Sequence, residues 1–157
     1  SISIFTRGTI YELRDTIWAM NKSKISLEDL HARISNFVEK ANLHLHNVIF
    51  TFNLDTSLSK DIEFSSIKGM SIYRIIQEAT NNAFKYAEAE KVSVSINQVS
   101  AGILVSIEDN GKGFDMNTVK KGNGLNNMKK RAEIVGVDFK IESKTNKGTT
   151  VILLISL

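Results

Sequence analysis

Two pairs of alternating apolar segments lie in the second half of this 157-residue sequence. Apolar and polar residues alternate with a period of two in each segment, which is typical of a β-strand with one buried face. Gln98–Gly102 separates the first pair and Asn146–Gly148 the second, and both linkers favour hairpin turns. Two antiparallel hairpins are therefore expected. Their apolar strand residues are Val92, Val94 and Ile96 with Ile103, Val105 and Ile107, then Val137, Phe139 and Ile141 with Val151, Leu153 and Ile155.

Segments with helical periodicity precede and separate these strands. Ser26 and Asp29 form a capping-box pattern, so a helix is expected to begin there. Gly136 lies where a left-handed helix C-cap is expected. The predicted helices span Thr9–Met20, Ser26–Ala41, Lys68–Ala87 and Leu125–Val135, while Val48–Leu54 is predicted as a strand and Thr56–Glu63 as a loop. About five strands and about three or four helices predict an α+β two-layer sandwich, with helices on one face of a mixed, mostly antiparallel sheet.

Composition narrows the function classes. The chain has no signal-peptide pattern and no run of about 18 apolar residues, so neither a transmembrane helix nor membrane contact is expected. It has no cysteine, which excludes disulfides and thiolate metal sites. The net charge of +3 is spread along the chain and does not indicate a nucleic-acid partner. A cytoplasmic location is expected, and membrane anchoring of a longer protein stays open.

The first candidate motif lies on the helix predicted over Lys68–Ala87. At about 100° per residue, Glu78, Asn82 and Lys85 fall within roughly 60° of one another on one helix face. The carboxylate and the amide offer oxygen ligands that suit Mg²⁺, and the ammonium can neutralise a phosphate. A solvated helix face with a Glu–Lys pair explains the same residues equally well.

The second motif, Glu108–Phe114, directly follows a predicted strand. The strand would hold Asp109 at its end, while Gly111 and Gly113 allow positive φ and close approach of the backbone to a ligand. An ionised carboxylate only accepts hydrogen bonds, so Asp109 suits the exocyclic amine of adenine, whereas guanine presents a carbonyl there. Asp-Asn-Gly is also strong turn chemistry, and alone a hairpin-type turn explains it slightly better.

The third motif, Gly122–Met128, leads into a predicted helix. Gly122 and Gly124 precede its first turn, where free N–H groups and the helix dipole favour an anion. A dinucleotide-binding fingerprint is excluded because no glycine occupies its third glycine position, and no Walker A pattern occurs in the chain. Alone, a flexible loop explains this motif better, and the stretch Lys112–Asn123 is expected to be mobile without nucleotide. The order of the three motifs is what makes a chance occurrence improbable.

Together these motifs resemble the GHKL ATP-binding superfamily, which includes gyrase, heat-shock chaperone, histidine kinase and mismatch-repair ATPases. The three motifs resemble its N, G1 and G2 boxes in that order, and Lys147–Val151 resembles its closing Gly-Thr motif. Gln77–Ala87 and Gly124–Ala132 further resemble sensor histidine kinases that pair with LuxR-type response regulators. The resemblance covers about Ile67–Leu157 and implies the Bergerat ATP-binding sandwich. Glu12–Asn21 resembles, more weakly, the end of a dimerisation helix.

The resemblance implies roles for individual residues. Asn82 would bind Mg²⁺, and Glu78 would position a water molecule or act as a base, so these two are the expected catalytic residues. Asp109 would bind adenine, with Thr149 supporting it through a water molecule. The other expected contacts to ATP are Asn82 itself, Lys85, Tyr86, Gly111, Gly113, Gly122, Gly124 and Leu125. Many relatives have histidine at the position of Tyr86. The tyrosine ring can still contact the nucleotide, but the resemblance does not extend to a proton-carrying role of that histidine.

The implied activity is transfer of the ATP γ-phosphoryl group to a histidine on a dimerisation domain, for relay to a response regulator. ATP and Mg²⁺ are the implied cofactors, and the chain's own dimerisation domain, in a homodimer, and the regulator are the implied partners. Residues 1–24 are expected to form the end of a dimerisation helix and a linker, and residues 25–157 the ATP-binding domain. The acceptor histidine is expected upstream of Ser1. Glu12–Met20 precedes His31, and Ala32 follows His31 where the family has an acidic residue.

Two other function classes stay open. One is a GHKL ATPase or serine kinase of the anti-sigma type, against which the Trp18-bearing helix and the regulator-type G2 box argue. The other is a non-catalytic nucleotide-binding module, against which the intact Asn82, Asp109 and glycine boxes argue.

Overall fold

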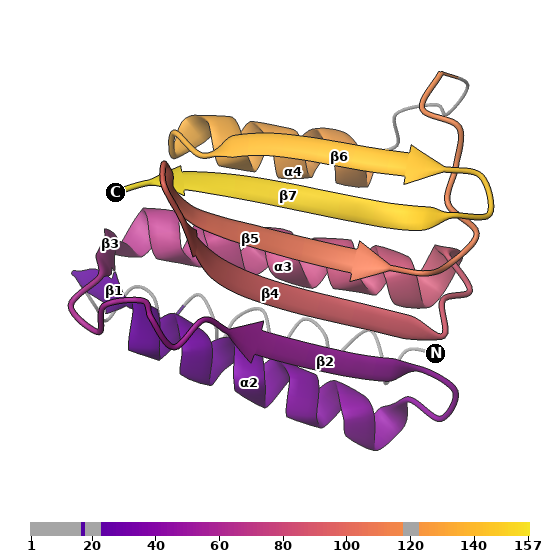
Figure 1. Cartoon of the computed structure of the whole chain (residues 1–157), viewed down its shortest axis with the longest axis horizontal. Coiled ribbons are helices and arrows are strands. Elements are labelled where there is room, and N and C mark those ends of the chain that lie inside the picture. The colour runs from indigo at the N-terminus through magenta and orange to yellow at the C-terminus, as the bar shows by residue number, and fades with distance from the viewer. Residues whose placement is uncertain (1–16, 18–22, 118–122) are drawn as a thin grey trace.

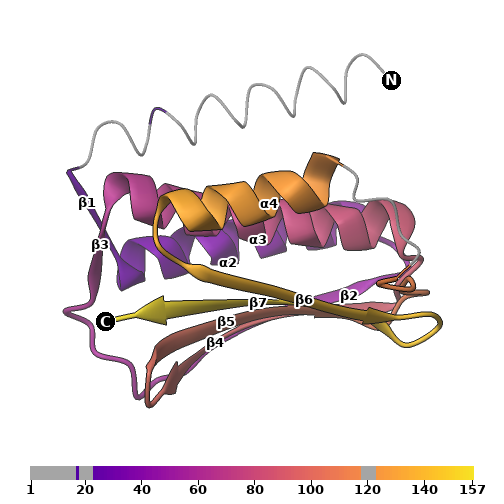
Figure 2. The same cartoon turned by 90° about the horizontal axis from the view of Figure 1, so that it is seen from above.

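The computed structural model describes residues 17, 23–117 and 123–157. The helices are α2 (Leu27–His44), α3 (Ser66–Tyr86) and α4 (Asn123–Ile134). The strands are β1 (Lys24–Ser26), β2 (Ile49–Leu54), β3 (Glu63–Ser65), β4 (Lys91–Val99), β5 (Gly102–Asp109), β6 (Asp138–Lys144) and β7 (Gly148–Ser156). A five-stranded sheet with the order β2-β4-β5-β7-β6 forms one layer, and the three helices cover one of its faces (Figures 1 and 2).

Both predicted hairpins are present in the sheet. β4 pairs with β5 and β6 pairs with β7, in each case antiparallel, and β5 and β7 join the two hairpins in a further antiparallel pair. β2 is parallel to β4, which makes the sheet mixed. The predicted α+β sandwich with helices on one face is therefore confirmed.

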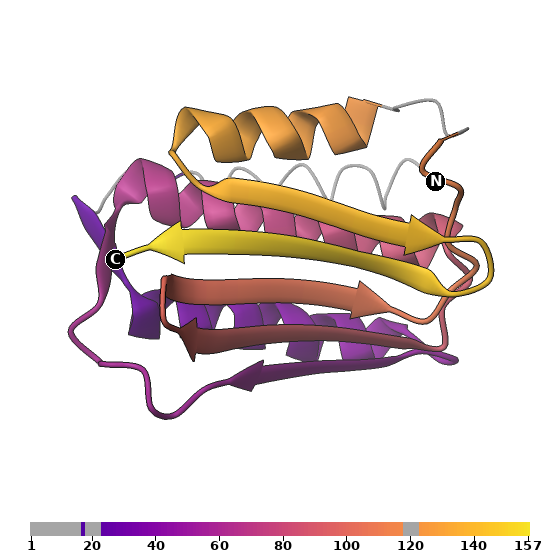
Figure 3. The same cartoon turned by 45° about the horizontal axis from the view of Figure 1, so that its top comes forward.

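The core lies between this sheet and the helices. α3 lies between α2 and α4 (Figure 3), and its Ile72, Ile75 and Ile76 side chains are fully buried. Burial of each such side chain contributes about 1.5–3 kcal/mol. Gly69 allows β1 to approach the same helix, because a Cβ at this position would lie 2.9 Å from the Cβ of Ile25. These contacts fix the rotation of α3 about its own axis. They thereby determine which side chains of its C-terminal half face the sheet and α4.

Two local signals in the sequence, the capping box and Gly136, located helix ends correctly. The capping box is confirmed, since Ser26 Oγ accepts the Asp29 N–H at 3.0 Å and the Asp29 carboxylate accepts the Ser26 N–H at 3.2 Å. Gly136 has the expected positive φ of 71°. α3 begins at Ser66, earlier than predicted, because the Ser65 hydroxyl caps it by accepting the Lys68 N–H.

Other expectations need correction or lie beyond the described part of the chain. β1 and β3 pair with each other and were not expected, because strands of three residues are too short to show alternation. The predicted helix over Thr9–Met20 lies outside the described residues, except for Ile17, which is helical. No helix within the described ranges is long and apolar enough to span a membrane.

Candidate functional site

Four chain segments meet at one end of the sheet. α3 and β5 end there, and β7 and α4 begin there (Figures 1 and 3). They surround a cavity of about 610 Å³, a size that suits a small-molecule ligand. The cavity is lined by Glu78, Ala79, Asn82, Ala83, Tyr86, Ala87, Ile107, Asp109, Lys112, Gly113, Phe114, Gly124, Leu125, Met128, Ile141, Thr149 and Val151.

The sheet supplies the floor of the cavity as two cross-strand rows on β5, β7 and β6. The apolar row is Ile107, Val151 and Ile141, and the polar row is Asp109, Thr149 and Ser143. All of these except Ser143 line the cavity. The rows are two residues apart along each strand, so both point to the same face of the sheet. The floor therefore combines a flat apolar area with a polar edge.

Asp109 lies at the polar edge, at the last position of β5. Its Oδ1 accepts the Gly111 N–H at 2.8 Å. Burial raises the pKa of its carboxyl above the usual 3.8, and the N–H groups of Gly111 and Thr149 oppose that shift. Because an ionised carboxylate only accepts hydrogen bonds, this edge of the cavity suits a ligand that donates one.

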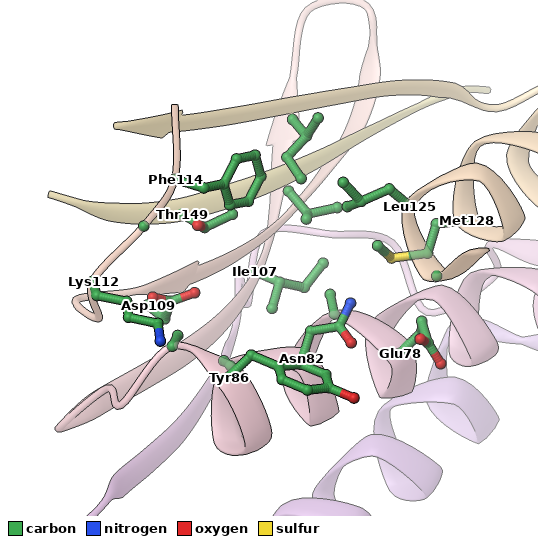
Figure 4. Close-up of a pocket in the computed structure, with 17 residues that line it drawn as sticks. Glu78, Asn82, Tyr86, Ile107, Asp109, Lys112, Phe114, Leu125, Met128 and Thr149 are labelled. Atoms are coloured by element: carbon green, nitrogen blue, oxygen red, sulfur yellow. The ribbon is translucent and has the colours of Figure 1, made fainter. Parts of the chain in front are cut away.

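α3 supplies one wall of the cavity. Glu78, Asn82 and Tyr86 follow one another at intervals of four residues, so they form one stripe along the helix (Figure 4). Lys85 is exposed and is not among the lining residues, although it is adjacent to Tyr86, because neighbouring residues lie about 100° apart around the helix. Glu78 and Asp109 lie at opposite ends of the cavity (Figure 4). The wall thus presents a carboxylate and an amide far from the polar edge of the floor.

The first turn of α4 packs closely against this stripe. A Cβ at Gly124 would lie 2.8 Å from Glu78 Oε1 and 3.5 Å from Asn82 Nδ2. The absence of a side chain at Gly124 therefore lets the helix start approach both polar groups. Leu125 and Met128 continue this wall as apolar residues.

The segment after Asp109 is fastened to its neighbours through the backbone. The Lys112 N–H donates to the Ala87 carbonyl at 2.7 Å, and the Lys112 carbonyl accepts the Asn146 N–H. The Phe114 N–H donates to Ser143 Oγ at 2.9 Å. The mobility expected for Lys112–Asn123 stays a prediction, and within that stretch the backbones of Lys112 and Phe114 are hydrogen-bonded to neighbouring segments.

Two glycines make this arrangement possible. A Cβ at Gly111 would collide with the Ala87 carbonyl, and one at Gly113, where φ is 57°, would collide with the Lys144 carbonyl. Only glycine fits these two close backbone approaches.

Asn110 ties the same segment to the start of β4. Its Oδ1 accepts the N–H groups of Glu90 at 2.9 Å and Lys91 at 2.8 Å, and its own N–H donates to the Lys91 carbonyl at 3.2 Å. The residue next to Asp109 is therefore held from both its side chain and its backbone.

These groups define the chemistry that the cavity can accommodate. The apolar floor with acceptors at its edge suits a flat ring that carries an amine. The distant pair of Glu78 and Asn82, beside the start of a helix, suits an anionic group with its cation. A nucleotide contains both parts.

A comparison with protein families agrees with this chemistry. Residues 67–157 match the family model described as histidine kinase-, DNA gyrase B- and HSP90-like ATPase. The chain belongs to this family. Membership implies that it binds ATP, and the matched range contains every residue that lines the cavity.

Solved structures share the fold of this ATPase-family chain. The histidine kinase domain of a blue-light activated histidine kinase from Erythrobacter litoralis superposes with a TM-score of 0.70 at 17% identity, covering 87% of this chain and 64% of that one. The catalytic domain of histidine kinase ThkA gives 0.65 at 18% identity, covering 85% and 94%. The ATP-binding domain of PrrB from Mycobacterium tuberculosis gives 0.62 at 19% identity, covering 85% and 95%. The chain thus spans less than two thirds of the first structure and nearly all of the other two.

Most residues selected from the sequence lie together in the ATPase-family cavity. Those that line it are Glu78, Asn82, Tyr86, Asp109, Gly113, Gly124, Leu125 and Thr149. Gly111 lies behind the lining, against Ala87, and Lys85 is not among the lining residues. Gly122 lies outside the described residues.

Several lining residues were not selected from the sequence as binding residues. They are Ala79, Ala83, Ala87, Ile107, Lys112, Phe114, Met128, Ile141 and Val151. Most are apolar residues at regular positions of their elements, and the pattern identified them only as core. Lys112 carried a usable signal, because it lies between the two glycines of the second motif.

Proposed function

We propose that this chain is the Mg²⁺–ATP-binding catalytic domain of a sensor histidine kinase. In this proposal it transfers the ATP γ-phosphoryl group to a histidine on a dimerisation domain, for relay to a response regulator. The observation that carries the proposal is one cavity that contains Asp109 at one end and Glu78 with Asn82, beside Gly124, at the other. The fold shared with catalytic domains of histidine kinases supports it.

The adenine would lie on the apolar row of the floor. Asp109 would accept a hydrogen bond from the exocyclic amine, and Thr149, directly opposite it on β7, would support that contact through a water molecule. Tyr86, which is 66% exposed, would contact the nucleotide at the mouth of the cavity. These contacts position the nucleotide, which is a main requirement of phosphoryl transfer.

The phosphates would then extend toward the start of α4. The N–H groups of its first turn favour an anion, and Gly124 leaves room for one beside Glu78. Mg²⁺ commonly takes one or two protein oxygen ligands and completes its shell with phosphates and water, so the amide oxygen of Asn82 fits it. When bound, the ion neutralises charge on the phosphates. Glu78 would position a water molecule or accept a proton.

The domain boundaries and the partners complete the proposal. Residues 1–24 would be the end of the dimerisation helix with a linker, and residues 25–157 the ATP-binding domain. The homodimeric partner domain, the response regulator and its LuxR type are proposed from the sequence resemblance alone. Lys85 stays a proposed phosphate contact, which would require its exposed side chain to turn toward the ligand.

The test uses the full-length protein that contains this chain, incubated with γ-labelled ATP and Mg²⁺. We expect an acid-labile label that is lost in Asn82→Ala, because phosphohistidine is labile to acid. An acid-stable label on a protein substrate would instead indicate a serine kinase. ATP hydrolysis without label would indicate an ATPase, and nucleotide binding without either would indicate a non-catalytic module.

A further inference from the structure

Ser143, on the edge strand β6, is one of three buried polar side chains in the described ranges, with 8% of its surface exposed. It does not line the cavity. Its hydroxyl nevertheless contacts two residues that do, accepting the Phe114 N–H at 2.9 Å and lying 2.8 Å from Thr149 Oγ1. Ser143 thus joins the loop that follows Asp109 to the residue opposite Asp109.

The hydrogen-bonding capacity of a hydroxyl fixes how these contacts are shared. Ser143 Oγ also donates to the Gly148 carbonyl at 3.2 Å. A hydroxyl has one proton and two lone pairs. The Gly148 carbonyl can only accept and the Phe114 N–H can only donate. All three contacts are satisfied together when Thr149 donates its proton to Ser143.

This assignment determines what Thr149 presents to the cavity. With its proton directed at Ser143, its oxygen faces the cavity with lone pairs, beside the acceptor-only Asp109. Without Ser143, the Thr149 hydroxyl could rotate and present a proton instead, and the Phe114 N–H would lose its acceptor. The arrangement of the polar edge therefore depends on a residue one strand further from Asp109 than Thr149.

We propose that Ser143 is a positioning residue for nucleobase recognition, acting through the Thr149 hydroxyl and the Phe114 backbone. The proposal rests on the proposed nucleotide site and extends it to a residue that touches no ligand. It predicts an effect on discrimination between adenine and guanine as well as on affinity, which a purely structural role would not produce.

The test is the affinity of the chain for ADP and for GDP, measured by calorimetry in wild type and in Ser143→Ala. We expect Ser143→Ala to bind ADP about five- to tenfold more weakly, the loss expected from a net hydrogen bond. GDP affinity should change less, so that the ratio of the two dissociation constants falls. Ser143→Thr keeps the hydroxyl and should restore most of the ratio.

Ser106→Ala is the matched control. It makes the same chemical change on β5, at a residue that does not line the cavity, and should leave both affinities unchanged. An unchanged ADP affinity in Ser143→Ala, or equal losses for ADP and GDP, would overturn the inference while leaving the proposed function intact. Absence of ADP binding in the wild-type chain would overturn both.

A measurement on the wild-type chain covers the case in which Ser143→Ala does not fold. The Phe114 amide hydrogen should exchange slowly without nucleotide, because Ser143 accepts it. Exchange there at the rate of an unstructured peptide would overturn the inference without any variant.

Discussion

Gly124 and Glu78 are in close proximity at the end of the cavity opposite Asp109, where a Cβ on Gly124 would lie 2.8 Å from Glu78 Oε1. The contact joins the first turn of α4 to the wall formed by α3. The atom that a Cβ would meet is the end of a flexible side chain, so the backbone can stay in place while Glu78 moves.

Gly124→Ala should therefore preserve the fold and impair the site. Alanine is favoured over glycine in a helix by about 1 kcal/mol, so the unfolding free energy should stay equal or rise. The displaced Glu78 should lower the phosphoryl-transfer rate of the full-length protein. Denaturant unfolding and a labelling time course check the two effects. In Glu78→Ala, Gly124→Ala should have little further effect, and additive losses would show that the two residues act separately.

Asp109→Asn should raise the stability of the nucleotide-free domain and weaken nucleotide binding. The pKa of Asp109 is higher in the folded protein than its unfolded value of 3.8, because burial disfavours the charged form. The protonated carboxyl therefore adds stability at pH below 3.8, and this contribution is lost as the pH rises through the higher folded pKa. Removal of the charge should therefore make the nucleotide-free variant more stable than wild type at pH near 7, and the difference should vanish below the unfolded pKa. Thermal unfolding across this pH window measures it, and a less stable variant at neutral pH would refute the argument.

The same variant should bind ATP more weakly, because a charged acceptor is replaced by a neutral one. Wild type should prefer ATP to GTP by about tenfold or more, since a buried unpaired polar group costs about 1–3 kcal/mol. Competition binding measures both quantities. Equal affinity of wild type for ATP and GTP would exclude Asp109 from base recognition.

Asn110→Ala should destabilise the domain by about 1–3 kcal/mol, because two backbone N–H groups at the start of β4 lose their acceptor. Asn110→Asp is the matched control, since a carboxylate oxygen can accept the same two hydrogen bonds. Denaturant unfolding should rank wild type and Asn110→Asp close together and Asn110→Ala well below. Equal destabilisation by both substitutions would show that the amide oxygen is not the important group.

His31 should not accept the phosphoryl group. It lies on α2, and its ring packs against Phe52 of the edge strand β2, with centroids 5.4 Å apart. The cavity lies over β5, β7 and β6, on the other side of β4 from that strand. Incubation of the chain with γ-labelled ATP and Mg²⁺ should leave no acid-labile label on His31. Label that disappears in His31→Ala would contradict both this placement and the proposed domain boundary.

Sequence periodicity identified the elements but not how they are placed against one another. The helical spacing of Glu78 and Asn82 was sufficient to select both residues. It selected both Lys85 and Tyr86 and could not show which of them lines the cavity, because that depends on where the sheet and α4 lie. Tyr86 lines the cavity and Lys85 does not.

The position of Ser143 in the sheet also could not be predicted from periodicity alone. The alternation predicted the hairpin that contains it, but its contacts with Thr149 and Phe114 depend on the register of β6 against β7 and on the path of the loop after β5. Neither is encoded in a local pattern. The β1–β3 pair, formed by residues on either side of α2 and β2, was missed because its three-residue strands are too short to show alternation.

The proposed site requires that ATP binds in this cavity with Mg²⁺ held at Asn82. Calorimetric titration of ATP into the chain, with Mg²⁺ and with a chelator, tests it in wild type and in Asn82→Ala. We expect wild type to bind ATP more tightly with Mg²⁺, and Asn82→Ala to stay folded but lose this Mg²⁺-dependent gain. Unchanged Mg²⁺–ATP affinity in folded Asn82→Ala would contradict it.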